Sequence, residues 1–146
     1  MSASRQPPPS DPEQGVWQGR RIARRVVSPD GLTILVGKTA RDNDILSLKL
    51  ADPLDFWMHA AGMAGSHVVV RNPDRLSRLP RETERLAAGL AAGYSKARKG
   101  GKVDIHLAFC DAVSKARGMP PGKVLLRRYK AVKAAPLRLE DLDGAG

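Results

Sequence analysis

The chain has 146 residues, enough for one domain with its own hydrophobic core, and nothing in this length demands a second domain. The formal net charge of +10 favours a polyanionic partner, while the single cysteine, Cys110, excludes an internal disulfide and a cysteine-based zinc site. No stretch approaches the ~20 apolar residues of a membrane helix and no signal-peptide segment is present, so we expect a cytoplasmic protein that does not bind membranes.

The first half of the chain predicts a hairpin and a short helix. Residues 1–15 are rich in Pro, Ser and Gln without apolar periodicity, which predicts a disordered lead before a domain over 16–139. Two apolar segments, 20–27 and 32–36, flank a Ser-Pro-Asp-Gly turn and predict a β-hairpin. A short helix is expected over about 40–50, capped by an Asp or Asn near its start.

Residues 55–70 (DFWMHAAGMAGSHVVV) predict two strands joined by a glycine-rich turn. Asp55, Trp57 and His59 alternate with apolar residues, so they share one face of the first strand. The second strand begins near Ser66 and His67. If the two strands pair, His59 and His67 lie close together.

The second half predicts the longest helix and most of the remaining sheet. Apolar residues recur at helical spacing over about 80–99, and the glycines Gly89 and Gly93 within this helix suggest a close contact, for which a sheet surface is the expected neighbour. Period-two alternation over 102–109 predicts a strand with His106 facing outward. Segments 123–128 and 129–132 are further strand candidates, and 140–146 is expected to be a flexible tail. These elements predict a single α+β domain with a mostly antiparallel sheet.

The positive charge is concentrated in one segment. Between residues 86 and 139, twelve basic residues face two acidic ones, so this segment carries the whole net charge of +10. The bases are Lys96, Arg98, Lys99, Lys102, Lys115, Arg117, Lys123, Arg127, Arg128, Lys130, Lys133 and Arg138. So local an imbalance favours polyanion binding over the ordinary interpretation of a charge run as a solvated face.

Four segments, in order, resemble the RNA-binding domain of the NFACT proteins, factors associated with ribosome quality control. They are VGK at 36–38 with DND at 42–44, DFWMH at 55–59 with GSH at 65–67, YSKAR at 94–98, and VSK at 113–115 leading through ARGMPPG to KV at 123–124. The last resembles the family's K-x-K/R-G-x-x-P-G turn. The resemblance covers about residues 31–136.

The resemblance implies binding of tRNA or ribosomal RNA, linked to translation or ribosome-associated quality control, with the large ribosomal subunit as one place of action. From the residues themselves we expect no catalysis, cofactor or metal, and we expect a monomer. Larger family members carry an N-terminal domain and a coiled-coil arm before this module, and no residues here supply either. We therefore expect a stand-alone copy that does not by itself direct C-terminal tailing of stalled peptides.

The residues expected to bind RNA are Lys38, Asn43, Trp57, His59, Ser66, His67, Lys96, Arg98, Lys99, Lys115, Arg117 and Lys123. Trp57 and His59 could stack on unpaired bases while the lysines and arginines hold the phosphate backbone. Core packing is an equal alternative for Trp57. Tyr94 lies on the apolar stripe of its helix, which favours packing there as well.

Two other classes of function remain as alternatives. Asp55, His59, Ser66 and His67, together with Asp104 and His106, could form a metal site or an acid–base pair for RNA processing or modification, although H-x(7)-H is not a recognised ligand spacing. A more economical interpretation is that Ser66 bonds to the backbone and His67 orients Asp55 or a phosphate. The second alternative is a module that docks on a ribosomal protein. Nucleotide hydrolysis is excluded because no Walker-type motif occurs.

Overall fold

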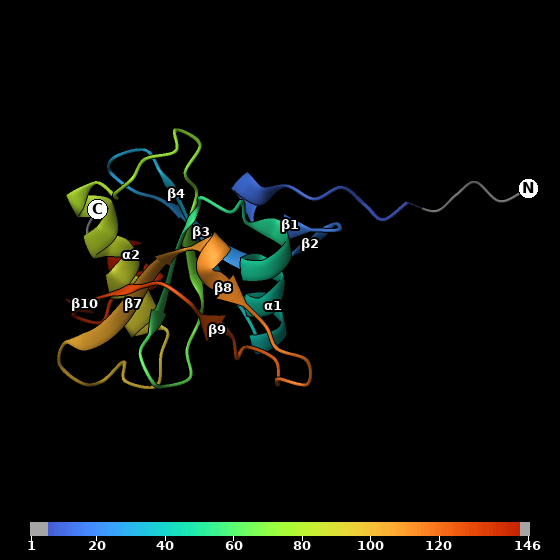
Figure 1. Cartoon of the computed structure of the whole chain (residues 1–146). Helices are drawn as coiled ribbons and strands as arrows, with labels where there is room; N and C mark the ends of the chain where they lie inside the picture. Colours follow the sequence, from blue (N-terminus) through green and yellow to red (C-terminus); the bar gives the residue numbers. More distant parts are fainter. Residues whose placement is uncertain (1–5, 144–146) are drawn as a thin grey trace, which may run out of the picture.

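A six-stranded antiparallel sheet of order β10-β7-β5-β6-β4-β3 forms the centre of the molecule in the computed structural model, which describes residues 6–143 (Figure 1). The pairs β1–β2 and β8–β9 lie outside it. The strands are β1 (Val16–Trp17), β2 (Arg20–Arg21), β3 (Ala23–Val27), β4 (Thr33–Gly37), β5 (Phe56–Ala60), β6 (Val68–Val70), β7 (Val103–Phe109), β8 (Val113–Ser114), β9 (Leu125–Leu126) and β10 (Lys130–Ala134). The helical elements are η1 (Pro12–Gln14), α1 (Ala40–Ile45), η2 (Leu46–Leu50), α2 (Arg81–Gly93), η3 (Cys110–Ala112) and α3 (Leu139–Asp143). The predicted α+β class is confirmed.

Helices cover both faces of the sheet, and strand alternation sends side chains into two separate cores. Phe56 and Met58 of β5 pack in the first core, beneath α2. Trp57 packs in the second core, on the opposite face, with Leu46 and Leu50 of η2. Figure 1 shows α2 on one side of the sheet and α1 on the other. The lone cysteine is buried in the second core, as expected of a small hydrophobe. No helix among residues 6–143 is long and apolar enough to cross a bilayer.

The locally predicted strand pairs are confirmed. β3 pairs antiparallel with β4 across the predicted turn, with Val27 opposite Thr33. β5 pairs antiparallel with β6, with Phe56 opposite Val70. Both pairs join segments close in sequence, for which turn residues and alternation carry most of the information.

The short helix forms where predicted, but its cap differs. Thr39, not an Asp or Asn, is the N-cap residue, and its hydroxyl accepts from the Asp42 amide at 3.0 Å. The Asp42 carboxylate instead pairs with Arg20 at 2.9 Å. The three polar residues 42–44 are therefore available for tertiary contacts.

The long helix is shorter than predicted: α2 ends at Gly93, and Lys96, Arg98 and Lys99 lie in the following turn. The chain turns there because Ser95 forms a bridge with Gly65 of the loop before β6. The sheet surface was expected to be the close neighbour of Gly89 and Gly93, but the neighbour in the structure is Leu137. A Cβ on Gly93 would collide with the backbone of Leu137, and one on Gly89 would come within 2.7 Å of the Leu137 side chain.

Gly93→Ala is therefore expected to lower the free energy of unfolding by about 1–3 kcal/mol, because the added methyl group must displace the Leu137 backbone. Urea denaturation measures this cost. Gly101→Ala is the matched control, since nothing lies within 4 Å of the added Cβ there. Equal stability of the two variants would contradict the packing argument.

Both predicted flexible ends need correction within the described residues. Residues 12–14 form η1, and Glu13 binds the Thr33 hydroxyl at 2.8 Å and the Arg71 guanidinium at 3.1 Å, so the predicted disordered lead is too long. The start of the predicted tail is helical, in α3. The remaining parts of the two predictions, residues 1–5 and 144–146, lie outside the described residues.

Candidate nucleic-acid interface

A cavity of about 900 Å³ opens on the face of the sheet opposite α2, where α1 and η2 leave β5 and β7 uncovered. We call it the histidine cleft. Trp57, His59, His67 and His106 line it. Its walls are the start of α1 with Lys38, the 62–66 loop, Tyr94, the 120–124 loop and Tyr129. The cleft combines aromatic rings with polar groups, as ligand sites do.

The histidine rings form a connected aromatic surface. The predicted proximity of His59 and His67 is confirmed, with ring centroids 5.3 Å apart. His59 also stands directly opposite His106 in the β5–β7 pairing. The His106 ring lies 4.2 Å from that of Tyr129, which is 54% exposed. This row of flat groups offers stacking surfaces for unpaired bases.

A chain of hydrogen bonds fixes His67 at the back of the cleft. Its Nε2 lies 3.0 Å from the Gly122 carbonyl oxygen, which can only accept, so Nε2 carries the proton. Nδ1 then accepts from the Ser47 hydroxyl at 2.7 Å, and Ser47 in turn accepts from the Trp57 indole N–H at 2.9 Å. The neutral imidazole satisfies every partner in this chain, and His67 joins the second core to the loop that walls the cleft.

Burial keeps two of the cleft histidines, His59 on β5 and His67 just before β6, uncharged at neutral pH. Burial lowers the pKa of His67 to about 4, with the nearby His59 acting in the same direction. The pKa of His59 is also lowered, chiefly by burial. At these two residues the floor of the cleft therefore offers a ligand uncharged rings for stacking and hydrogen bonding. The positive charge comes from lysines at the mouth of the cleft.

The low pKa of His67 predicts acid sensitivity. Between pH 6.5 and about 4 the unfolded chain binds a proton at this position that the folded protein excludes, so the stability present above pH 6.5 falls as the pH falls. The contribution is on the order of 3 kcal/mol over this window. Urea unfolding of wild type and His67→Gln across the window measures it: the variant should be less stable at pH 7 but lose less stability on acidification. Parallel curves would contradict the assignment.

The loop with the K-x-K/R-G-x-x-P-G pattern is held against α1 by Asp44. One carboxylate oxygen of Asp44 accepts from the Gly122 amide at 3.1 Å, and the other pairs with Lys115 at 2.9 Å. Lys115 also donates to the carbonyls of Pro120 and Lys123. Lys115 was expected to hold phosphate; the structure corrects this, because its ammonium group is used within the loop.

Seven of the twelve predicted residues meet at the cleft: Lys38, Asn43, Trp57, His59, Ser66, His67 and Lys123. Lys38 and Lys123 are exposed, and neither forms an ion pair with any residue in 6–143. Asn43 has a positioning role: its side chain accepts from the His67 amide at 3.1 Å. Ser66 donates to the Gly37 carbonyl at 2.8 Å, which confirms that it bonds to backbone.

The structure corrects the base-stacking interpretation of Trp57, because the side chain is only 2% exposed and its indole N–H is already bonded to Ser47. The exposed rings of the cleft belong to other residues. His59 is half-buried on the same strand face, and Tyr129 stands at the mouth. His59 and Tyr129 therefore offer accessible ring faces that Trp57 does not.

The other predicted cations lie outside the cleft. Lys96, Arg98 and Lys99 are exposed in the turn after α2, and the Lys96 amide donates to Ala64 on the cleft rim at 3.0 Å. Arg117 is exposed in the loop held by Asp44. These four form no ion pair within the described part of the chain. They extend the positive surface beyond the cleft.

The candidate enzymatic group is only partly assembled: His59, Ser66, His67 and His106 line the cleft, whereas Asp55 and Asp104 do not. Asp55 precedes β5 and pairs with Arg71 at 2.6 Å, while His67 binds Ser47 and Gly122 and does not orient Asp55 as expected. Burial raises the pKa of Asp55, and hydrogen bonds from the backbone of Asp52 and Asn72 oppose that shift. Within residues 6–143 no cluster of three or more His, Cys, Asp or Glu could hold a metal ion.

Sequence reasoning did not assign His106 and Tyr129 to RNA binding. The outward alternation of His106 was visible, but its position beside His59 depends on β5 pairing with β7, strands separated by more than forty residues. Tyr129 reaches the cleft only because β10 pairs with the far edge of β7. No local pattern signals either contact.

Comparisons with known proteins agree with this geometry. The family model described as "NFACT protein RNA binding domain" matches residues 23–128. The "Rqc2 homolog RqcH" of Bacillus subtilis is 37% identical over 75% of this chain, and that of Streptococcus suis is 37% identical over 80%. The chain spans only 18% and 21% of these two relatives. A solved structure of the C-terminal part of the fibronectin/fibrinogen-binding protein from Streptococcus suis has a TM-score of 0.76 and 32% identity, over 86% of this chain and 49% of that one.

Proposed function

Because this chain belongs to the NFACT RNA-binding domain family, we propose that it binds structured RNA of the translation machinery through the histidine cleft and the cations around it. The observation that carries this proposal is the juxtaposition of aromatic rings with two exposed lysines that form no ion pair among residues 6–143. His59, His106 and Tyr129 provide surfaces on which bases stack. Lys38 and Lys123, at the mouth of the same cleft, provide charges that neutralise phosphates.

The proposed target is tRNA or ribosomal RNA, and the proposed setting is ribosome-associated quality control. The curated relatives named Rqc2 homologs support this setting. Since the chain spans about a fifth of their length, the proposal covers the RNA-binding step and no other activity of those proteins. With ribosomes as the proposed partners, the proposed location is the cytoplasm, and the large subunit is the first candidate to test.

The test is binding of the purified protein to tRNA, to each ribosomal subunit and to a length-matched duplex DNA over a range of salt concentrations. We expect tight binding that favours tRNA or a ribosomal subunit over DNA and that weakens steeply as salt rises. Equal affinity for tRNA, the ribosomal subunits and DNA would mean that the positive charge attracts any polyanion nonspecifically, and would contradict the proposal. Ribosome association that resists both high salt and ribonuclease would instead indicate docking on a ribosomal protein, and would contradict the proposal.

A further inference from the structure

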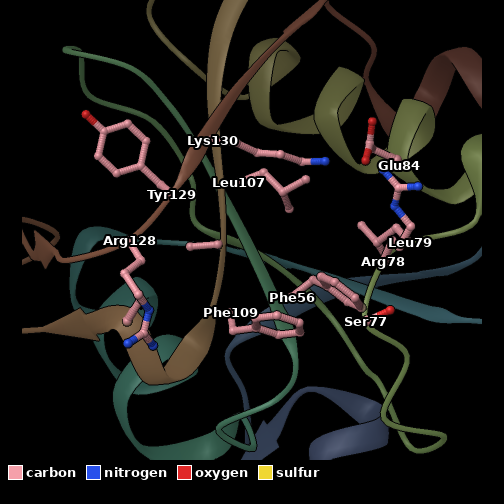
Figure 2. A pocket seen from close by; sticks show the side chains of 12 residues that line it. Phe56, Ser77, Arg78, Leu79, Glu84, Leu107, Phe109, Arg128, Tyr129 and Lys130 are labelled. Carbon is pink, nitrogen blue, oxygen red and sulfur yellow. The ribbon is translucent and has the colours of Figure 1, made fainter.

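A second cavity, of about 300 Å³, lies on the α2 side of the sheet, where β10 stops short of the end of β7 (Figure 2). We call it the phenylalanine pocket. β10 begins at Lys130 opposite Leu107, so Phe109 at the end of β7 extends beyond it. The pocket is open at this point because β10 does not extend beside the last two residues of β7, which pair only with β5 among the described strands.

Two aromatic rings form its apolar part. The Phe56 and Phe109 ring centroids lie 4.9 Å apart with an angle of 31° between the rings, and Figure 2 shows the two rings next to each other. Phe56 is buried, while Phe109 is half-buried and borders the cavity. Leu79 and Leu107 complete the apolar lining. A flat ligand can therefore stack on Phe109 without displacing core side chains.

The rim of the pocket is charged and mostly positive. Arg78, in the loop before α2, and Lys130 are both exposed, and neither pairs with an acidic side chain of the described residues. Figure 2 shows their cationic ends on the side of the pocket where Glu84 of α2 stands. One carboxylate thus accompanies two cations that have no ion-pair partner between residues 6 and 143, an arrangement that suits an anionic ligand carrying a hydrogen-bond donor.

The pocket also adjoins the histidine cleft. The two cavities lie on opposite faces of the sheet, and both are lined by Tyr129, in the segment 128–130 at the edge of β7. An RNA strand held in the cleft can cross this segment and enter the pocket. A continuous path of this kind favours a nucleotide over an acidic peptide as the occupant.

We infer that the phenylalanine pocket binds one unpaired nucleotide of the RNA. Its base stacks on Phe109, its amino group donates to Glu84, and its phosphate contacts Arg78 and Lys130. A cavity at the small end of the range for ligand sites suits a single nucleotide and not a helix. The inference rests on the proposed RNA binding and adds to it a second site with a preference for bulged or single-stranded positions.

The test uses two hairpin RNAs that differ by one bulged 2-aminopurine, a fluorescent base that is quenched on stacking. The wild-type protein should bind the bulged hairpin roughly tenfold more tightly than the fully paired one and quench its fluorescence. Lys130→Ala and Phe109→Leu should each remove most of this preference while leaving affinity for the paired hairpin nearly unchanged. Arg85→Ala is the control, because Arg85 is 79% exposed and lines neither cavity.

Three other outcomes would overturn the inference, and they differ in what they say about the histidine cleft and the phenylalanine pocket. Equal affinity for the two hairpins, or a bulge preference that survives both pocket variants, would overturn the inference and leave the histidine cleft as the RNA site. Failure to bind either hairpin, tRNA or ribosomal subunits would overturn the proposed function and the inference together. Binding of an acidic aromatic peptide that depends on Lys130 and Phe109, without any bulge preference, would assign the pocket to a protein partner.

Discussion

Reversing both charges at the mouth of the histidine cleft, with Lys38→Glu and Lys123→Glu together, is expected to weaken RNA binding roughly 100-fold near physiological salt. Both lysines are exposed, line the cleft and form no ion pair within residues 6–143. Each reversal replaces attraction for a phosphate by repulsion. Titration at several salt concentrations should also show a salt slope smaller by about two, one for each lost phosphate contact.

The matched control carries the same change in charge on another face. Arg81→Glu with Arg85→Glu alters two exposed residues at the start of α2 that line neither cavity. This variant should keep most of the affinity. If the two double variants lost affinity equally, overall charge and not the cleft would account for binding.

Asp55→Ala is expected to lower the free energy of unfolding by about 3–5 kcal/mol. The Asp55 side chain is 2% exposed, pairs with Arg71 at 2.6 Å and accepts from the amides of Asp52 and Asn72 at 3.0 and 2.9 Å. Its removal leaves a largely buried guanidinium and two backbone donors without this acceptor. The midpoint and slope of urea unfolding, followed by circular dichroism, give the cost.

Asp52→Ala provides the comparison, since Asp52 pairs with the same Arg71 guanidinium at 3.2 Å but its side chain is 68% exposed. Its loss should cost less than about 1 kcal/mol. The Asp52 backbone amide that bonds to Asp55 remains in this variant. A cost for Asp55→Ala no larger than that for Asp52→Ala would refute the view that the buried carboxylate organises this end of the sheet.

Local sequence predicted the strands and missed the contacts between distant segments. Alternation around Trp57 gave the correct faces of β5, because side-chain direction in a strand depends only on period two. The end of α2 was placed too late, since helix propensity carries no information about Gly65, which forms a bridge with Ser95 from a distant loop. The order in residues 12–14 was missed for the same reason: the partner of Glu13 is Arg71.

In the candidate site, too, contacts between neighbouring segments were predicted and contacts between distant segments were not. His59 and His67 were found together because one turn joins their strands. The uses of Lys115 and Trp57 were not predictable, since a lysine or tryptophan has the same local signature whether it faces solvent or has a partner. Only the tertiary structure shows Asp44 beside the former and Ser47 beside the latter.

The polar attachment of the loop at residues 115–123 has a consequence for motion. Its links to the body of the protein at Asp44 and His67 are hydrogen bonds and an ion pair, which water can replace, whereas β5 lies between two apolar cores. The loop can therefore open as a small unit while the sheet stays folded. In hydrogen–deuterium exchange the Gly122 amide should exchange well before that of Trp57, and bound RNA should slow the former without changing the latter.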